Sequence, residues 1–332
     1  MPKTIFFNKA EGPESLEVVE TAIPNPGATE VVVEMKAAGL NRSEYMFLTN
    51  TYVFQPSFPS TIGTEGAGIV YDVGSQVTEF KRGDEVCITP NILPQEYGVM
   101  GQYVNVPVEA LLPKPPELSF DQAASVWMSL STAYFGLISN GGLKPHFDQT
   151  VLVTAASSSL GVAVIQMAKF HGAKVIATSR TSAKKAFLLS MGADHVIATE
   201  EEDLQSKVRQ FTDGKGFDIG FDMVAGDMIP MLADVAAPHA TILLGGLLSL
   251  EIPEIPFLPM VMKNLSLRSF HVVLHLLRKP ELFEVASKHI LEGLRNGHYS
   301  AEIDRVFDFP NVADAYAYLA NSTQQGKVVV RF

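Results

Sequence analysis

The stretch TVLVTAASSSLG at residues 150–161, followed by VAVIQMAKFHG at residues 162–172, decides the fold. Residues 151–153 are a continuous apolar run, which is the pattern of a strand buried in a parallel sheet. Residues 161–171 place apolar side chains at helical spacing and end at Gly172, a residue type that often follows the last turn of a helix. A strand, a turn of small residues and a helix in this order predict one βα unit of a parallel sheet.

The same alternation continues on both sides of this unit. Further strands are predicted at residues 174–178, 194–198, 217–221 and 241–244, and helices at residues 121–138, 182–191, 200–211 and 227–236. Strands that alternate with helices of about 10–15 residues predict an α/β domain with a doubly wound parallel sheet.

The two ends of the chain have a different character. Residues 1–120 read as short strands and turns, with one short helical pattern at residues 41–48, and this predicts a β-rich domain. Beyond residue 280 we expect helices at residues 282–296 and 312–320 and strands at residues 306–309 and 327–332.

Composition and charge exclude several classes of protein. The 332 residues include 36 acidic and 25 basic side chains, so the net charge is −11 and nucleic acid is not expected as a partner. The first residues have no signal-peptide pattern, and the apolar region 240–262 is interrupted by two glutamates and three prolines. We therefore expect a soluble, cytoplasmic protein that does not enter a membrane.

Soft metal ligands are scarce in this chain. Cys87 is the single cysteine, and His146 is the first of eight histidines. A disulfide within the chain is impossible, and a zinc site rich in thiolates is excluded. A zinc site built from the first 145 residues would depend almost entirely on carboxylates.

The turn between residues 153 and 161 predicts a dinucleotide site. All of residues 155–161 except Leu160 are Ala, Ser or Gly, so a pyrophosphate can approach the backbone N–H groups at the helix N-terminus. The usual glycine spacing is only partly kept, because Ala155 and Ser158 stand at the two earlier glycine positions. The alternative is an α/β domain whose small residues only tighten the turn. The candidate cofactor-binding residues of this turn are Ser157, Ser158, Ser159, Leu160 and Gly161.

The end of the second strand favours NADP(H) over NAD(H). An NAD site usually has an acidic residue about 20 residues beyond the turn, and residues 178–184 read TSRTSAK, without an acid. A guanidinium holds a 2′-phosphate through paired hydrogen bonds, and Ser179, Arg180 and Lys184 supply such donors. The alternative is that Arg180 and Lys184 are ordinary solvated residues at a helix start.

Five motifs spread over nearly the whole chain carry a family resemblance. They are GLNRSE at residues 39–44, GTEGAGIV at 63–70, FDMV at 221–224, LGGL at 244–247 and GKVV at 326–329, together with the turn described above. The second fits the signature G-x-E-x-x-G-x-V. Together they resemble the zinc-free quinone oxidoreductase branch of the medium-chain dehydrogenase/reductase superfamily.

The resemblance implies a domain plan and further contacts. A β-rich, GroES-like catalytic domain formed by residues 1–120 and 272–332 would be interrupted by a Rossmann domain for NADP(H) at residues 121–271. Cofactor contacts are implied for Thr132, Val224, Gly245 and Gly246. A homodimer is also implied, with residues 240–250 either as a sheet-edge contact or as core.

The chain departs from the zinc-dependent members of the superfamily. Those enzymes carry a ligand His just before the signature Glu and a Cys in the stretch that matches residues 41–44. Here these places hold Thr64 and the sequence NRSE, so no metal site is expected. His271 and His275 are four residues apart but lack the Glu of a zinc-protease helix, and we assign them to the core or to an interface.

Without a metal, the resemblance implies hydride transfer from NADPH to a small hydrophobic substrate, either a quinone or the activated C=C bond of an enone, alkenal or enoyl group. Tyr52 matches a tyrosine that lies over the nicotinamide in related reductases, and it either donates to the substrate oxygen or forms a wall. Asn41 either braces the nicotinamide ribose or the substrate carbonyl, or it caps a turn. The alternatives are an NADP-dependent alcohol dehydrogenase and a non-catalytic NADPH-binding protein.

Overall fold

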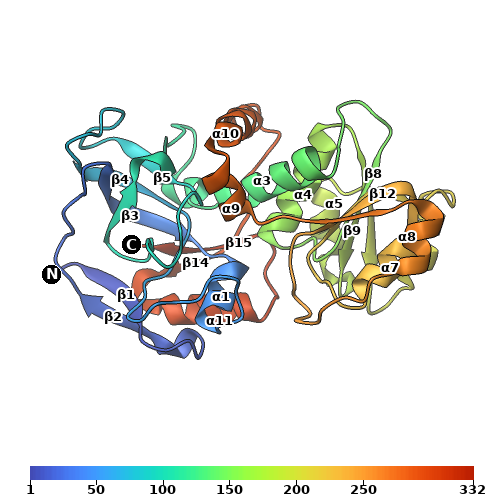
Figure 1. Ribbon diagram of the computed structural model, residues 1–332, viewed down its shortest axis with the longest axis horizontal. Helices are drawn as coiled ribbons and strands as arrows, with labels where there is room; N and C mark the ends of the chain where they lie inside the picture. Colours follow the sequence, from blue (N-terminus) through green and yellow to red (C-terminus); the bar gives the residue numbers. More distant parts are fainter. The chain divides into compact units, whose positions relative to one another are not determined.

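The chain divides into two compact units (Figure 1). The computed structural model describes residues 1–332, apart from the side chains of residues 278 and 280. The first unit consists of Met1–Met128, Leu276–Pro280 and Ala301–Phe332, and the second of Ser129–His275 and Glu281–Ser300. The boundaries predicted from the sequence assign residues 272–275 and 281–300 to the first unit and residues 121–128 to the second, whereas the structure groups them the other way.

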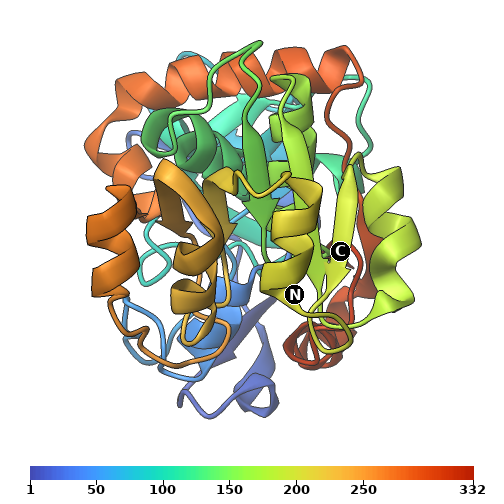
Figure 2. The ribbon, with the colours of Figure 1, turned by 90° about the vertical axis from the view of Figure 1, so that its right-hand side faces the viewer.

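The second unit contains a six-stranded sheet in which all neighbouring strands are parallel (Figure 2). In spatial order the strands are β10 (His195–Ala198), β9 (Lys174–Ser179), β8 (Thr150–Val153), β11 (Phe217–Asp222), β12 (Ala236–Leu244) and β13 (Ser266–Ser269). The chain winds outward from β8 in one direction and from β11 in the other. This confirms the predicted doubly wound sheet, and ligands of such sheets bind at the carboxyl ends of the strands where the winding reverses.

Helices flank this sheet and shield its apolar strands. They are α4 (Ser159–Phe170), α5 (Lys185–Ser190), α6 (Leu204–Phe211), α7 (Met228–Val235) and α8 (Phe257–Lys263), with a short 3₁₀ helix at Ser182–Lys184. A further helix, α10 (Pro280–Arg295), packs on α4 through the rings of His289 and Phe170, whose centroids are 5.4 Å apart. Leu152, Ile176 and Ile242 from three different strands lie in one buried cluster with α6 and α7 side chains such as Val208 and Leu232. Within the described residues, no helix combines the length and the apolar character needed to cross a bilayer.

The single helix predicted at residues 121–138 is divided into three parts. They are α2 (Phe120–Ala123), α3 (Trp127–Tyr134) and a π-helical segment, Phe135–Asn140. The Ser125 hydroxyl donates to the carbonyl of Asp121, and the Asn140 side chain donates to the carbonyl of Phe135 at 2.6 Å. Polar side chains that bond to nearby backbone in this way compete with regular helical hydrogen bonding. The apolar spacing was therefore correct, but it did not reveal the breaks.

Of the two alternatives for residues 240–250, a sheet edge or core, the sheet edge is wrong for the part that lies in β12. β12, which contains Ala240 to Leu244, pairs with β11 on one side and with β13 on the other. Ala240, Ile242 and Leu243 are buried, as the core alternative required. The edge strands of the sheet are β10 and β13.

The first unit is built on a seven-stranded sheet that combines both ends of the chain. Its path runs β14 (Ile303–Asp308), β15 (Lys327–Arg331), β3 (Glu30–Gly39), β4 (Gly66–Val73), β5 (Glu85–Ile88) and β7 (Leu111–Pro113), while β6 (Tyr103–Pro107) pairs with β3. A separate hairpin-like pair joins β1 (Lys3–Phe7) to β2 (Leu16–Glu20). The last strand, β15, pairs antiparallel with β3, and Val329 lies opposite Gly39. The C-terminal end of the chain therefore contributes to the same sheet as the N-terminal strands.

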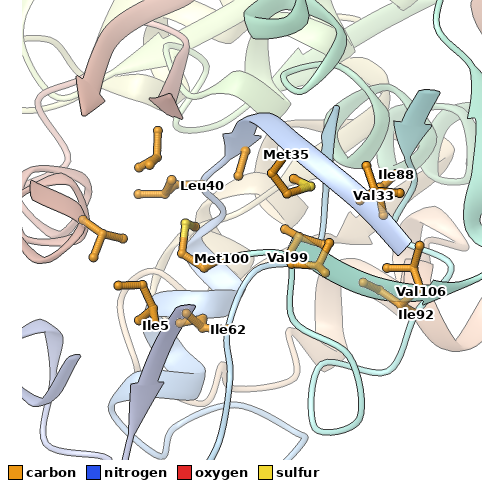
Figure 3. Close-up of a cluster of buried hydrophobic side chains, with 14 of the residues drawn as sticks. Ile5, Val33, Met35, Leu40, Ile62, Ile88, Ile92, Val99, Met100 and Val106 are labelled. Atoms are coloured by element: carbon orange, nitrogen blue, oxygen red, sulfur yellow. The ribbon is translucent and has the colours of Figure 1, made fainter. Parts of the chain in front are cut away.

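Short helices connect and cover these strands. They are α1 (Arg42–Leu48), α11 (Val312–Ala320) and 3₁₀ turns at Pro13–Ser15, Val108–Ala110 and Phe309–Asn311. The helix α9 (Val272–Arg278) begins in the second unit and ends in the first. Figure 3 shows part of the buried cluster, in which Val33 and Met35 of β3 lie among Ile88, Val99 and other apolar side chains. Buried and less buried residues alternate on β6, whereas β3 is buried along most of its length.

Candidate functional site

The turn after β8 has the geometry of a phosphate-binding loop. The Ser158 hydroxyl accepts a hydrogen bond from the N–H of Gly161 at 3.1 Å and caps α4, whose other first-turn N–H groups lie at the same end. Ala155 has φ of 46°, the left-handed conformation for which a glycine is usual. At Gly161 a Cβ atom would lie 2.4 Å from the carbonyl oxygen of Ala156. Ala155 thus adopts the glycine-type turn, while position 161 has no space for a side chain.

Asp222, at the end of β11, ties this turn to the neighbouring loop. Its Oδ1 accepts from the Thr154 hydroxyl at 2.7 Å and its Oδ2 from the N–H of Ala225 at 2.6 Å. The Thr154 hydroxyl in turn accepts from the N–H of Met223 at 2.9 Å. Burial raises the pKa of the Asp222 carboxyl, and these hydrogen bonds oppose that rise. The sequence marked Asp222 only as part of a motif, and its structural role comes from partners 68 residues away in the chain.

The loop after β12 brings two predicted glycines to the same edge. The N–H of Gly245 donates to the carbonyl of Asp222 at 2.7 Å. A Cβ atom at Gly245 would lie 2.5 Å from the Phe221 ring, and one at Gly246 would lie 2.8 Å from the carbonyl oxygen of Met223. The carboxyl edge of β8, β11 and β12 therefore gathers residues 157–161, Val224, Gly245 and Gly246. Thr132, the other predicted cofactor residue, is buried in α3.

The end of β9 carries the predicted basic residues. Lys184 Nζ donates to the Ser157 hydroxyl at 3.0 Å, so this ammonium group lies beside the phosphate-binding turn. Ser179 is buried and its hydroxyl donates to the carbonyl of Thr181 at 2.7 Å, whereas Arg180 is exposed. The structure therefore joins Lys184, predicted as a donor to the 2′-phosphate, to Ser157 of the predicted phosphate-binding turn.

Sequence reasoning missed an acidic segment at this place. Residues 199–202 read TEEE and follow β10, which pairs with β9. The N–H of Ser182 donates to Glu201 Oε1 at 2.9 Å, and the N–H of Glu200 donates to the carbonyl of Arg180 at 2.9 Å. The signal was present in the parallel-sheet prediction, because the loops that follow adjacent parallel strands leave the sheet at the same edge.

A buried polar network occupies the signature region of the first unit. Glu65, which is fully buried, forms an ion pair with Lys327 of β15, a residue also removed from solvent. The other oxygen of Glu65 accepts from the N–H of Met128 at 2.9 Å. A Cβ atom at Gly39 would lie 2.7 Å from Lys327 Cε, so a glycine is required where the lysine passes.

Glu44 is the second carboxylate of this network. Its Oε1 accepts from the N–H of Thr64 at 2.8 Å and from the Thr64 hydroxyl at 2.5 Å. Its Oε2 accepts from the N–H of Asn41 at 3.0 Å and from the Tyr316 hydroxyl at 2.9 Å. Burial raises the pKa of Glu44, and the hydrogen bonds and the positive charge of Lys327 oppose that rise.

Asn41 connects the two carboxylates. Its Nδ2 lies 3.1 Å from Glu65 Oε1 and 3.3 Å from Glu44 Oε1, and its Oδ1 accepts from Lys327 Nζ at 2.7 Å. Asn41 is also the N-cap residue of α1, and Glu44 bonds back to its N–H. The amide group is therefore engaged within the protein in this conformation.

Tyr52 lies in the loop that follows α1. Its ring packs edge-on against Phe54 with the centroids 5.7 Å apart, and its phenol forms a hydrogen bond with the side chain of Ser43. Burial raises the pKa of the phenol well above its usual value, although the bond to Ser43 opposes the rise. The phenol is therefore neutral over the physiological pH range and is a hydrogen-bond donor there.

The residues at the position of a superfamily zinc site do not fit a zinc ion. Thr64 and Asn41 replace the imidazole and thiolate ligands, and the Lys327 ammonium lies among them, where a dication would be repelled. Cys87 is fully buried and burial raises the pKa of its thiol to about 12. Across the described side chains, no group of three or more His, Cys, Asp or Glu is arranged to hold a metal.

Comparisons with known proteins agree with this geometry. Residues 27–116 match the family model of the alcohol dehydrogenase GroES-like domain, and residues 159–292 match that of zinc-binding dehydrogenases. A quinone oxidoreductase-like protein 2 homolog from Nematostella vectensis is 33% identical over 314 residues, which cover 92% of this chain and 82% of that protein.

Two solved structures extend the likeness to the whole fold. The quinone oxidoreductase of Escherichia coli, solved with NADPH, is 28% identical with a TM-score of 0.89 over 99% of this chain and 100% of the other. The CurK enoyl reductase is 25% identical with a TM-score of 0.88 over 99% of both chains. The two units described above are thus the two domains of an established oxidoreductase architecture.

The Glu65–Lys327 pair predicts a large stability effect. Replacing Lys327 by Met leaves the Glu65 charge buried without a cation, so we expect the free energy of unfolding to fall by about 3–5 kcal/mol. The double variant Lys327→Met with Glu65→Gln should recover part of this loss. Urea unfolding measures both. Lys36→Met, which removes a half-exposed pair with Glu34, is the control and should cost less than about 1 kcal/mol. Equal losses of stability in Lys327→Met and Lys36→Met would contradict the conclusion that the buried Glu65–Lys327 pair stabilises the fold.

Proposed function

Because the chain belongs to the quinone oxidoreductase family of the medium-chain dehydrogenase/reductases, we propose that it is an NADPH-dependent, metal-independent reductase of a quinone or of an activated C=C bond. The observation that carries the proposal is the edge of the parallel sheet, where a capped helix N-terminus, two close-packed glycines and Lys184 meet. The network around Lys327 supports independence from a metal, because it fills the ligand positions with groups that do not fit zinc.

The residues at this edge have distinct roles in the proposal. The backbone N–H groups of residues 157–161 would bind the pyrophosphate, and Arg180 and Lys184 would hold the 2′-phosphate. Thr132, Val224, Gly245 and Gly246 would line the nicotinamide end. When bound, NADPH supplies a hydride from C4 of its nicotinamide. The quinone oxidoreductase of Escherichia coli was solved with NADPH bound, and this similarity supports the same cofactor for the present chain.

Tyr52 is the proposed donor to the substrate oxygen. Hydride addition to a quinone or to a conjugated carbonyl places negative charge on that oxygen, and a positioned donor stabilises it. Burial raises the pKa of the Tyr52 phenol, so the group is protonated at neutral pH and would donate a hydrogen bond to that oxygen. Ser43, which shares a hydrogen bond with the phenol, would orient it. In this proposal Asn41 acts through the network that fixes the start of α1, not as a free donor.

A substrate panel tests the proposed activity. We expect NADPH oxidation with at least one of benzoquinone, phenanthrenequinone, an alkenal and a 2-enoyl thioester, at a rate that a chelator does not change. Oxidation of simple alcohols that is lost with the chelator would instead identify an alcohol dehydrogenase. Tight NADPH binding without turnover of any acceptor would identify a non-catalytic NADPH-binding protein.

The role of Tyr52 has its own prediction. Tyr52→Phe removes the donor and should lower kcat/KM by about 10²-fold, with unchanged NADPH affinity. Because burial raises the phenol pKa, the neutral donor persists above the usual value of 10.0, so wild-type kcat/KM should show no loss near pH 10 from this group. Tyr45→Phe, a hydroxyl deletion on α1, is the control. An unaltered rate for Tyr52→Phe would leave this residue as a wall of the site.

A homodimer is the proposed assembly. Exposed apolar side chains gather on α8 and the loop before it, close in sequence to the edge strand β13: Leu250, Ile252, Ile255, Phe257, Leu258, Val261 and Met262. Contiguous exposed apolar surface of this kind marks association sites. Sedimentation velocity should give about twice the chain mass of 36.1 kDa, and Ile252→Lys with Phe257→Glu should yield monomers. Phe147→Glu, an exposed apolar residue elsewhere, is the control, and a monomeric wild type would refute the assembly.

A further inference from the structure

The adenosine end of the proposed cofactor site includes an acidic residue, Glu201, that the sequence analysis does not predict there. Glu201 Oε1 accepts the backbone N–H of Ser182 at 2.9 Å, and Ser182 begins the 3₁₀ turn that contains Lys184. The hydrogen bonds from Ser182 lower the pKa of Glu201, so this carboxylate is ionised at neutral pH. An anion is thus bound at a backbone N–H between the two cationic residues assigned to the 2′-phosphate.

We propose that Glu201 is a specificity-determining residue that opposes the 2′-phosphate of NADPH and favours NADH, so that the chain discriminates between the two cofactors less than Arg180 and Lys184 alone would allow. The inference rests on the proposed function, because it concerns the same cofactor site. It adds a residue from the loop after β10 to a site otherwise built from the ends of β8, β9, β11 and β12.

Charge and hydrogen bonding give the two cofactors opposite responses to this carboxylate. A phosphate monoester carries nearly two negative charges at neutral pH and accepts hydrogen bonds, so it competes with Glu201 for the N–H of Ser182 and is repelled by the carboxylate. The ribose 2′-hydroxyl of NADH is a donor, and a carboxylate near the end of the second strand is its usual acceptor. Because Glu201 is exposed, solvent screens the repulsion and the effect on affinity is moderate.

The neighbouring glutamates are held differently. Glu202 pairs with Lys185, the first residue of α5, at 2.7 Å and accepts the N–H of Ala198 at 2.8 Å, so its charge is compensated by a cation. Glu200 contacts the residue after β9 through its backbone, because its N–H donates to the carbonyl of Arg180. Glu201 is the member of the three whose carboxylate binds the turn between Arg180 and Lys184.

Fragment binding tests the inference without reference to turnover. The probes are adenosine 2′,5′-bisphosphate, which carries the 2′-phosphate, and 5′-AMP, which lacks it, titrated calorimetrically into the full chain. Glu201→Gln should tighten binding of the bisphosphate by about three- to tenfold and leave 5′-AMP unchanged or weaker, so the ratio of the two affinities rises. The same change should appear in the ratio of NADPH to NADH affinity and should shrink at high salt.

Two control variants separate the possible results. Glu200→Gln removes the same charge one residue away, and an equal gain would show a general field effect and overturn the assignment to Glu201. Arg180→Asp should weaken bisphosphate binding by more than about tenfold. An unchanged affinity ratio in Glu201→Gln, while wild type binds both fragments, would refute this inference alone. Failure of wild type to bind either dinucleotide would refute the proposed function itself.

Discussion

The buried negative charge of Glu65 is the constraint on which the first unit depends. A carboxylate without solvent is tolerated only with a cation and further donors, and here these come from Lys327, Asn41 and the N–H of Met128. Their positions in the chain explain why β15, the last strand, must lie beside β3. Three of the motifs that carry the family resemblance are GLNRSE, GTEGAGIV and GKVV. They therefore supply residues to one buried network of charged and polar side chains.

Asp222 is a buried carboxylate of the second unit, as Glu65 is of the first, but its hydrogen-bond partners include no cation. It receives hydrogen bonds from Thr154 and from the N–H of Ala225, and burial raises its pKa. Such a group holds loops together through fixed donors. Because its donors come from the ends of both β8 and β11, it keeps these two loops at a constant separation where the direction of winding reverses.

Periodicity was sufficient to predict the parallel sheet, the β-rich unit and the turn after β8, because each depends on residues close together in the sequence. The absence of imidazole and thiolate at residues 41–44 and 64 was equally visible. Contacts between distant segments could not be predicted from the sequence. Lys327 is 262 residues from Glu65, and Glu201 reaches Ser182 only because β10 pairs with β9. Between α2 and α3, within the helix predicted at residues 121–138, the Ser125 hydroxyl bonds to the carbonyl of Asp121, a contact that apolar spacing does not report.

The identity of the groups around residues 41–65 limits which substrates this unit can serve. A bound zinc ion would stabilise the localised charge of an alkoxide, whereas Lys327 is already engaged by Glu65 and Asn41. The neutral phenol of Tyr52, with its raised pKa, is a weaker source of stabilisation. An enolate or hydroquinone anion spreads its charge by conjugation and is less basic than an alkoxide, so a single neutral donor is adequate for it. Under the proposed function, the engagement of Lys327 by Glu65 and Asn41 would thus favour conjugated acceptors over simple alcohols and ketones.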